Sequence, residues 1–323
     1  MSTNVLVIAE SRDGAIKGIT KEAVGCAADL AAQLGGEAHT LLIADPGLAE
    51  QLAACGGAKV LRAQGEGLDQ YSPEAWTAVV SQAIAAGEYA LVVTGHSYQA
   101  IDFFPRLAAA HDAALVPDVT AVSFEDGRCV FSRKVMNGKL DARTVPTGDG
   151  IVFASLQQGA FPPQPAPASA AVEDFAVDIS GVTTRPVVEI KEAEKGDVDL
   201  SAADIIVAGG RGVGDQEKFA AVFELADVLG AAVGASRPPC DSEWVEHERQ
   251  IGSSGQVVAP KLYIALGISG AIQHVVGMRG SQCIVAVNKD PNAAIFQEAS
   301  YGIIGDLHEI VPALAQAVKE ARG

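Results

Sequence analysis

Ile205-Ile206-Val207-Ala208-Gly209-Gly210-Arg211 is a short apolar run that ends in two glycines and a cation, and the chain shows this kind of pattern five times up to Asp306. Each run has the length and the residue types of a buried strand, and helical stretches separate most of the runs. The other four are Ala231–Ala235 into Ser236-Arg237, Leu262–Leu266 into Gly267-Ile268-Ser269-Gly270, Ile284–Val287 into Asn288, and Ile303-Ile304 into Gly305-Asp306.

Strands that alternate with helices form a parallel sheet, and their carboxyl ends then lie along one edge, where ligands bind. Small residues at those ends let a ligand approach the backbone, while Ser, Asn, Asp and Arg offer hydrogen bonds. The pattern therefore predicts a doubly wound C-terminal domain with a nucleotide-type cofactor site spread over five loops.

The first half of the chain also alternates strand and helix, which predicts a parallel βαβ domain. The expected strands are 4–9, 38–44, 60–63 and 90–94, and the expected helices are 20–34, 48–54 and 73–86. Thr20 is the expected N-cap of the first helix. Ser72 is the expected N-cap of the third, with Pro73 in its first position.

From Val119 to Leu156 the pattern changes to short strands with Gly-containing turns, which predicts an antiparallel addition to the same domain. A loop at residues 10–14 has one glycine and two acids, so we do not expect it to bind phosphate. His96 follows a strand, and we interpret it as a loop histidine.

A proline-rich join follows, because residues 161–171 contain four prolines among alanines and are expected to be extended. We place the domain boundary near Asp197. The predicted domains are 1–196, a scaffold and partner domain that includes this segment, and 197–323, the cofactor domain. We expect the second domain to swivel on the segments near Pro162–Pro167 and Asp197.

The composition narrows the class of protein. The chain has 323 residues, enough for two domains, and is 49% hydrophobic with 34 glycines and 5% aromatic residues, as in soluble α/β proteins. A formal charge of −17 argues against a nucleic-acid partner and against an anionic membrane surface. No apolar run approaches membrane-spanning length.

The cysteines and the N-terminus indicate a cytoplasmic protein. Five scattered cysteines without a C-x-x-C pair argue against structural zinc and iron–sulfur ligation and favour reduced thiols. The chain begins Met1-Ser2-Thr3-Asn4 and is expected to enter a strand at once, so we expect no signal or transit peptide.

Two segments at the strand ends carry the chemistry of the predicted site. Gly209–Gly214 follows a strand and precedes an expected helix at 217–229, although its G-x-G-x-G spacing is a weak signal. Arg211 in this turn suits a phosphate or a carboxylate. Ser269 and Gly270 stand at an expected helix N-terminus, which favours an anion, and His274 lies about one turn later.

Two further segments extend the site. Gln250-Ile251-Gly252-Ser253-Ser254-Gly255 is a polar loop with no apolar face to bury, and such loops lie on the surface unless they cover a ligand. At Ser236-Arg237-Pro238 the proline is expected to hold Arg237 in an extended conformation, from which its side chain projects over the crevice. On spacing alone, His274 is interpreted as a histidine that is exposed or hydrogen-bonded for structural reasons.

Taken in order, these segments resemble the FAD domain of the electron transfer flavoprotein α subunit. The most specific stretch is Lys261-Leu262-Tyr263-Ile264-Ala265-Leu266-Gly267-Ile268-Ser269-Gly270-Ala271-Ile272-Gln273-His274. Supporting stretches are Gly209–Gly212, Gly234–Arg237, Asn288–Pro291, Ile295-Phe296 and Tyr301–Leu307. Together they cover nearly all of residues 204–312, and the N-terminal half agrees in length and pattern.

The resemblance implies an FAD site carried over position by position. Arg211, Ser236 and Ser269–His274 are implied to hold the pyrophosphate and ribityl region, and Asn288, Asp306 and Leu307 the adenosine end. Arg237 is implied to lie against the isoalloxazine ring, Ser254 to bond flavin N5, and His274 to face the N1–C2=O edge. The implied cofactor-binding residues are Arg211, Ser236, Arg237, Gln250, Ile251, Gly252, Ser253, Ser254, Ser269, Gly270, Ala271, Ile272, Gln273, His274, Asn288, Asp306 and Leu307.

One departure from the family pattern concerns Ser253-Ser254, where the family often reads Gln-Thr. A serine hydroxyl can replace that of threonine with a looser rotamer, because serine lacks the β-branch. Ser253 is shorter than Gln, so a ribityl or phosphate contact made by Gln is lost or made through water. The resemblance thus implies that Ser254 bonds flavin N5, whereas it does not carry the role of Gln over to Ser253.

The implied function is that of an electron carrier without substrate turnover of its own. It pairs with an electron transfer flavoprotein β subunit, takes single electrons from flavin dehydrogenases and passes them to a membrane quinone oxidoreductase. Two alternatives stay open on the residues alone: an NAD(P)-dependent oxidoreductase, and a flavin-lacking adenine-nucleotide-binding module. The sequence is silent on the identity of the donors and on a second, electron-bifurcating flavin in the β subunit.

Overall fold

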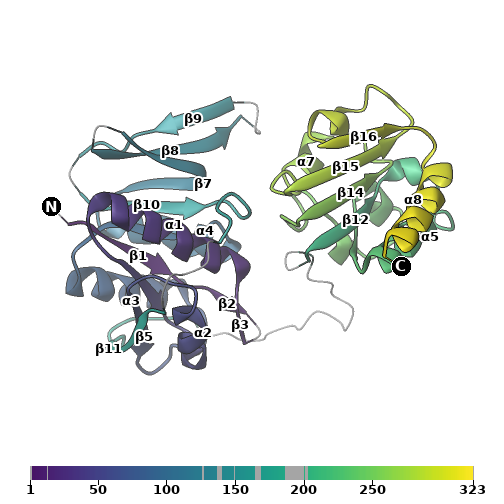
Figure 1. Ribbon diagram of the computed structural model, residues 1–323. Helices are drawn as coiled ribbons and strands as arrows, with labels where there is room; N and C mark the ends of the chain where they lie inside the picture. The colour runs from purple at the N-terminus through teal and green to yellow at the C-terminus, as the bar shows by residue number, and fades with distance from the viewer. Residues whose placement is uncertain are drawn as a thin grey trace. The chain divides into compact units, whose positions relative to one another are not determined.

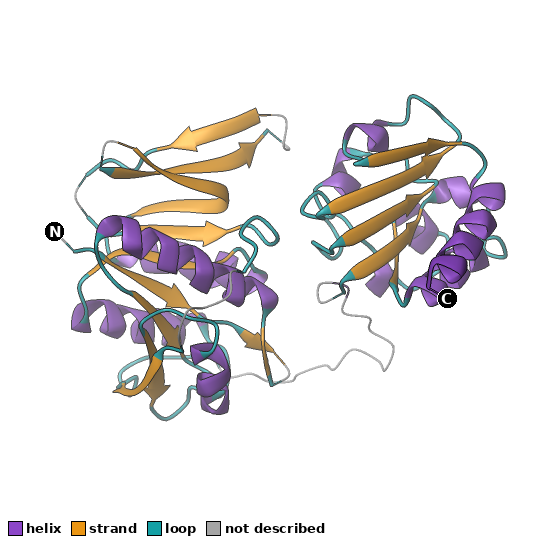
Figure 2. Ribbon diagram, viewed as in Figure 1, coloured by secondary structure: helices purple, strands orange, loops and turns teal. Residues whose placement is uncertain are grey.

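A computed structural model describes residues 2–12, 14–125, 127–136, 140–148, 150–163, 169–185, 200 and 203–322. The chain divides into two compact units, Met1–Ile190 and Lys191–Gly323 (Figure 1). In both units, helices pack on the strands of a sheet (Figure 2). Within the described ranges, no helix has the length and apolar character needed to cross a membrane.

The N-terminal unit contains a sheet of nine described strands in the order β11-β5-β4-β1-β6-β10-β7-β8-β9. Neighbouring strands from β11 to β7 are parallel, and β8 pairs antiparallel with both β7 and β9. The strand bounds are β1 Asn4–Ile8, β4 Ala38–Leu42, β5 Lys59–Gln64, β6 Tyr89–Gly95, β7 Ala114–Glu125, β8 Arg128–Val135, β9 Leu140–Thr144, β10 Val152–Leu156 and β11 Ala171–Ala176. A small separate hairpin pairs β2 (Ser11–Arg12) with β3 (Ala15–Ile16).

Two hydrophobic cores lie on the two faces of this sheet. Val5 and Val7 of β1 belong to one core, with helices α1 (Gly18–Leu34) and α2 (Ala49–Ala53). Leu6 and Ile8, which alternate with them, belong to the other, with α3 (Pro73–Ala86) and α4 (Tyr98–Ala110). Burial on both faces explains why the central strand is apolar throughout. The short helix η1 (Pro46–Leu48) precedes α2.

The predicted βαβ domain with an antiparallel addition is confirmed, as is the cap of α3, where the Ser72 side chain accepts from the Ala75 amide. Four details of the prediction were wrong, the first being that helix α4 was missed. β10 is parallel to both neighbours rather than part of the antiparallel addition; its almost continuous apolar run is typical of an interior strand. The edge strand β11 was missed, and Thr20 is not the N-cap of α1.

Thr20 lies inside α1, whose N-cap is Lys17, and it has a tertiary role instead. Its buried hydroxyl accepts from the Glu10 amide at 2.9 Å and donates to the Glu10 carbonyl at 3.0 Å. The carbonyl also accepts from the Lys17 amide. The hydroxyl thus fastens the first turn of α1 to the carboxyl end of β1.

The C-terminal unit is a five-stranded parallel sheet, in its described part, with the order β13-β12-β14-β15-β16. All five strands predicted from the sequence are present, and the predicted doubly wound fold is confirmed. The strand bounds are β12 Ile205–Gly209, β13 Ala232–Ala235, β14 Leu262–Leu266, β15 Cys283–Asn288 and β16 Tyr301–Ile304.

Each face of this second sheet is covered differently. Helices α5 (Ala220–Leu229) and α8 (Leu307–Arg322) pack on one face (Figure 1), together with the short α6 (Arg237–Asp241). Loops and short helices cover the other face, among them α7 (Ile272–Val275) and η5 (Ala294–Gln297). The remaining short helices are η3 (Arg211–Val213) and η4 (His247–Arg249). The predicted swivel segments near Pro162–Pro167 and Asp197 fall largely outside the described residues.

We predict that Thr20→Val lowers the free energy of unfolding of the N-terminal unit by about 2 kcal/mol. Valine keeps the shape of threonine but leaves the buried Glu10 amide without its acceptor. The measurement is urea unfolding of the full-length chain carrying Trp244→Phe, because Trp76 of the N-terminal unit is then its only tryptophan.

Thr77→Val is the matched control. The Thr77 hydroxyl donates to the Pro73 carbonyl of its own helix α3. Removal of this hydroxyl therefore leaves no buried donor unpaired. We expect a change below about 0.5 kcal/mol for this variant. Equal effects of the two substitutions would contradict the tertiary role assigned to Thr20.

Candidate functional site

The candidate site lies at the topological switch point of the C-terminal sheet. After β12 the chain moves to β13 on one side, and after β14 it moves to β15 on the other. The two loops that leave β12 and β14 therefore diverge, and a crevice opens between them at the carboxyl edge. This edge is where the sequence predicted the cofactor.

Backbone contacts hold the two diverging loops close together. The Gly210 amide donates to the Leu266 carbonyl at 2.8 Å, and the Gly212 amide donates to the Gly267 carbonyl at 2.9 Å. A Cβ atom on Gly212 would lie 2.6 Å from the Gly267 oxygen, so no larger residue fits. Gly267 has a φ of +62°, which L-residues with a side chain rarely adopt. Glycine is thus required on both sides of this contact.

The loop 250–255 is tied to the turn that contains α7. The Ser253 amide donates to the Gln273 carbonyl at 2.7 Å, and the Gly252 amide donates to the Gln256 carbonyl at 3.1 Å. The Gln250 side chain donates to the Ser254 hydroxyl at 3.0 Å. The sequence expectation that this loop has no apolar face was wrong, because Ile251 is buried in the core.

Polar groups remain available at the edge. The amides of Ser269, Gly270 and Ala271 have no hydrogen-bond acceptor within the described part of the chain. The side chains of Arg211 and Ser269 are exposed, as are those of Ser253 and Ser254. A run of free N–H groups beside a cation is suited to an anion such as a pyrophosphate.

His274 is placed differently from its neighbours. Its ring is buried, with Nε2 2.9 Å from the Tyr263 hydroxyl and Nδ1 3.0 Å from the Ile251 carbonyl oxygen. Burial lowers the pKa of His274 to about 4, and the Ile251 carbonyl opposes this shift. The imidazole is therefore neutral at physiological pH. This agrees with the interpretation from spacing, a histidine bonded for structural reasons, while the contact with a flavin edge stays a prediction.

Arg237 is the first residue of α6, so the expectation that Pro238 holds it extended was wrong. Proline is tolerated in the first turn of a helix, where its missing N–H is not needed. The exposed guanidinium lies beside the Asp241 carboxylate one turn later, with Nε 3.1 Å from Oδ2. The buried Ser236 precedes it, and the Ser236 amide donates to Gly209 of the neighbouring strand.

The far end of the crevice is built from the last two strands. The Asn288 side chain donates to the Ile268 carbonyl at 2.9 Å, which joins the loop after β15 to the loop after β14. Asp306 accepts from the His308 amide at 2.9 Å at the start of α8. The buried Leu307 belongs to the core under α8. The predicted adenosine-end residues therefore already have partners in the fold.

Sequence reasoning missed three residues of this region: Tyr263, Asp241 and His308. His308 Nε2 donates to the Val213 carbonyl at 2.9 Å and so joins α8 to the turn after β12. Tyr263 had a readable signal, since a tyrosine in an otherwise aliphatic central strand needs a partner for its hydroxyl. Asp241 and His308 had none, because surface acids and histidines are common.

The N-terminal unit has a comparable edge that is already filled. The buried Glu10 carboxylate after β1 accepts from the Ser97 hydroxyl after β6 and from Lys17 Nζ at 2.8 Å. His96 Nδ1 lies 2.9 Å from the Ser155 hydroxyl, and burial lowers the pKa of His96. A carboxylate at this position disfavours an anionic ligand.

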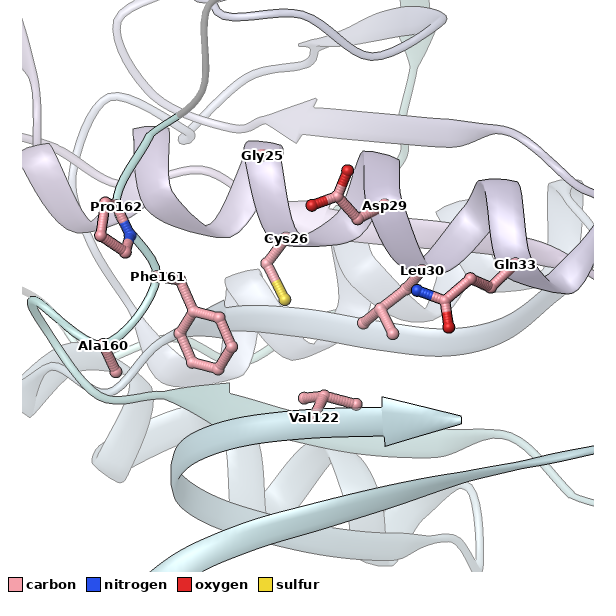
Figure 3. Close-up of a pocket in the computed structure, with 9 residues that line it drawn as sticks. All are labelled: Gly25, Cys26, Asp29, Leu30, Gln33, Val122, Ala160, Phe161 and Pro162. Carbon is pink, nitrogen blue, oxygen red and sulfur yellow. The ribbon is translucent and has the colours of Figure 1, made fainter. Parts of the chain in front are cut away.

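A cavity of about 250 Å³ lies in the N-terminal unit between α1 and β7. Figure 3 shows Cys26, Leu30, Phe161 and Val122 facing this space. Burial raises the pKa of Cys26 to about 12, so its thiol stays protonated and unreactive. None of the predicted cofactor residues lines the cavity. Within the described residues, no group of three or more His, Cys, Asp or Glu could hold a metal ion.

Comparison with known proteins identifies related chains. Residues 5–180 match the electron transfer flavoprotein domain, and residues 199–279 match the electron transfer flavoprotein FAD-binding domain. The electron transfer flavoprotein subunit alpha of Bacillus subtilis (strain 168) is 40% identical, over 99% of this chain and 98% of the relative. The protein FixB of Clostridium saccharobutylicum is 36% identical, over 98% and 96%. A probable mitochondrial subunit alpha of Caenorhabditis elegans is 36% identical, over 98% and 93%.

These matches confirm FAD as the predicted cofactor. The free amides of Ser269–Ala271 and the exposed Arg211 suit the pyrophosphate. The glycines at 210, 212 and 267 leave the edge without side chains that would keep a ligand from the backbone. The residues of the crevice therefore fit FAD.

We predict that Gly267→Ala destabilises the C-terminal unit by about 2 kcal/mol more than Gly230→Ala does. Both glycines have a positive φ, +62° and +66°, but a Cβ on Gly230 meets no atom within 4 Å, whereas one on Gly267 lies 2.7 Å from the Gly212 backbone. Backbone strain alone costs about 1 to 2 kcal/mol, and overpacking adds about 1 to 3 kcal/mol. The measurement is urea unfolding of the full chain carrying Trp76→Phe, followed through Trp244.

We predict that acid weakens the C-terminal unit through His274. The unfolded histidine takes up a proton near pH 6.5, and the folded one only near its pKa of about 4. Between these values the unfolded chain binds more protons, so stability falls as the pH falls. The total loss from this group is about 3 kcal/mol and is complete below the folded pKa.

The check is the difference between the chain with native His274 and His274→Gln, which cannot titrate, both carrying Trp76→Phe and measured by urea unfolding through Trp244 from pH 7.5 to pH 4. We expect the native chain to lose stability more steeply than the variant over this range. Parallel curves would show that His274 is not held neutral by burial.

Proposed function

The chain belongs to the family of electron transfer flavoprotein α subunits, and we propose that it carries single electrons as the FAD-holding half of a two-chain complex. The observation that supports this most is the crevice at the switch point of the C-terminal sheet, where glycine contacts, free amides and exposed polar side chains fit FAD. FAD, when bound, takes up and releases electrons one at a time.

In the proposed site, Ser269–Ala271 bind the pyrophosphate through their backbone amides, helped by Arg211. Ser236 and Ile272–His274 border the ribityl region. Asn288, Asp306 and Leu307 lie toward the adenosine end and position its loops through their own hydrogen bonds and packing.

Around the reactive ring, Arg237 supplies the positive charge. A guanidinium keeps its proton at all relevant pH values, so it favours an added electron more strongly as water is excluded. Asp241 holds the guanidinium and offsets part of its charge. Ser254, whose hydroxyl lies 3.0 Å from Gln250 Nε2, can donate to flavin N5 or accept from it.

The β subunit is proposed to close the site from the other side. In the single chain, Arg211, Arg237, Ser253 and Ser254 are exposed. A cation can influence a redox group strongly only where solvent is kept away, so a second protein surface is needed. Flavin dehydrogenases are the proposed donors and a membrane quinone oxidoreductase is the proposed acceptor.

The test is stepwise photoreduction of the full-length chain, co-expressed with its β subunit, followed by visible absorption. We expect bound FAD whose reduction halts after one electron. A colourless complex would point to a nucleotide-binding module, and a flavin that takes two electrons at once would point to hydride transfer. Either outcome would overturn the proposal.

We predict that Arg237→Ala lowers the first reduction potential of the complex by on the order of 50 mV, which corresponds to roughly 1 kcal/mol for one electron. The measurement is a redox titration of the flavin by its absorption. Lys261→Ala is the matched control: Lys261 is similarly exposed and paired with Asp204, but it precedes β14 at the opposite edge of the sheet. Equal first reduction potentials in the two variants would show that Arg237 does not lie against the isoalloxazine ring.

A further inference from the structure

Tyr263 and His274 form a buried pair beneath the crevice. The Tyr263 side chain on β14 is fully buried, and its hydroxyl lies 2.9 Å from His274 Nε2. The ring centroids are 6.2 Å apart. On the other side of the imidazole, Nδ1 lies 3.0 Å from the Ile251 carbonyl oxygen. Both ring nitrogens are therefore engaged by groups of the same chain.

Chemistry allows only one arrangement of protons in this chain of groups. A carbonyl oxygen can only accept, so Nδ1 must carry the hydrogen that reaches Ile251. Burial raises the pKa of Tyr263 well above its ordinary value, so the phenol keeps its proton and donates it to Nε2. The neutral Nδ1–H tautomer of His274 satisfies both partners, whereas the Nε2–H tautomer could donate to the Tyr263 oxygen but would leave the Ile251 carbonyl without its donor and the Tyr263 hydrogen without an acceptor.

The hydrogen bond to Ile251 reaches the loop that contains Ser254. Ile251 packs in the core, the next amide donates to Gln256, and the Ser253 amide donates to the Gln273 carbonyl beside His274. Gly252 cannot be replaced without a clash, because its Cβ would lie 2.6 Å from the Gln273 oxygen. His274 is thus the side-chain link between the central strand and this exposed loop.

We propose that Tyr263 is a positioning residue for FAD: its hydrogen bond to Nε2 holds the His274 ring in the orientation in which Nδ1–H reaches Ile251, and His274 in turn fixes the loop that contains Ser254. The inference rests on the proposed function, since the loop matters as part of the cofactor site. Tyr263 itself contacts no ligand in this arrangement. A buried strand residue thereby sets the geometry of an exposed edge.

Tyr263→Phe tests the proposal with little change in shape. Phenylalanine keeps the ring but leaves Nε2 of His274 without a donor in the core. The imidazole must then leave Nε2 without a partner in the core or rotate to find one, and rotation breaks the bond from Nδ1 to Ile251. We expect an Nδ1–H signal that is lost or shifted, faster amide exchange in residues 251–256, and FAD affinity about tenfold lower.

The chain contains a matched control in its other unit. Tyr89 of β6 is buried, and its hydroxyl lies 3.0 Å from Nδ1 of His39. Burial raises the pKa of Tyr89 to about 12. Tyr89→Phe therefore removes the same kind of hydrogen bond outside the FAD domain, and we expect it to leave FAD affinity and His274 unchanged.

The experiment uses the full-length αβ complex with ¹⁵N-labelled histidine. The ring signals of the six histidines are recorded, and His274 is assigned by its absence in His274→Gln. FAD affinity is measured by flavin fluorescence after removal and readdition of the cofactor. The native complex should show neutral His274 with its proton on Nδ1, a readout that needs no variant and no electron transfer.

The outcomes separate this proposal from the proposed function. A native His274 with its proton on Nε2 overturns it, even if Tyr263→Phe fails to fold. So does a folded Tyr263→Phe complex whose His274 ring signals, loop exchange and FAD affinity are unchanged, or one whose FAD affinity is no lower than that of Tyr89→Phe. If the complex binds no FAD at all, the proposed function fails, while the tautomer and the exchange of the loop still test the link from Tyr263 to Ile251.

Discussion

The close contact between the backbones of Gly212 and Gly267 is the constraint on which the rest of the site depends. It fixes the two loops that diverge from the switch point of the sheet, with the Gly212 amide bonded to the Gly267 carbonyl and no room for a Cβ. No side chain fits into this contact, so the polar groups of the crevice come from the residues on either side of it. The free amides of Ser269–Ala271 belong to the same loop as Gly267, and the contact therefore holds them in place.

The two units show how one architecture can be open or closed at the same place. Both have parallel strands whose carboxyl ends share one edge of the sheet. In the N-terminal unit, the buried carboxylate of Glu10 fills that edge and is satisfied by Ser97 and Lys17. In the C-terminal unit, glycines stand there instead and leave amides free. The difference lies in a few residues after equivalent strands, so fold alone does not distinguish a scaffold from a cofactor domain.

Much of the fold could be predicted, because buried strands are visible in the sequence as apolar runs with small residues at their ends. The five strands of the C-terminal unit were found in this way. The errors have local causes. The position of β10 in the chain, directly after the antiparallel strands, suggests that it belongs with them, although its continuous apolar pattern indicates an interior strand. Thr20 resembles an N-cap in the sequence, because nothing there shows that its hydroxyl reaches back to Glu10.

The candidate site was harder to predict than the fold, because pairing between side chains is not periodic. The spacing of Arg237 and Asp241 is that of any surface ion pair on a helix, and the strand position of Tyr263 does not tell which group meets its hydroxyl. Pro238 even suggests the wrong backbone conformation for Arg237. A residue before proline prefers an extended conformation, but this preference is weaker than the helical conformation that the start of α6 imposes.

Burial divides the electrostatic work of the crevice between two residues. His274 lies so deep that its pKa of about 4 makes it neutral, so it can orient hydrogen bonds but cannot supply a full charge. Arg237 lies at the surface with Asp241, where water weakens its field. In the proposed site, the buried His274 therefore orients hydrogen bonds and the exposed Arg237 supplies the charge. That charge gains strength only when a second protein surface excludes the solvent, which makes the electrostatics of this site a property of the assembled complex.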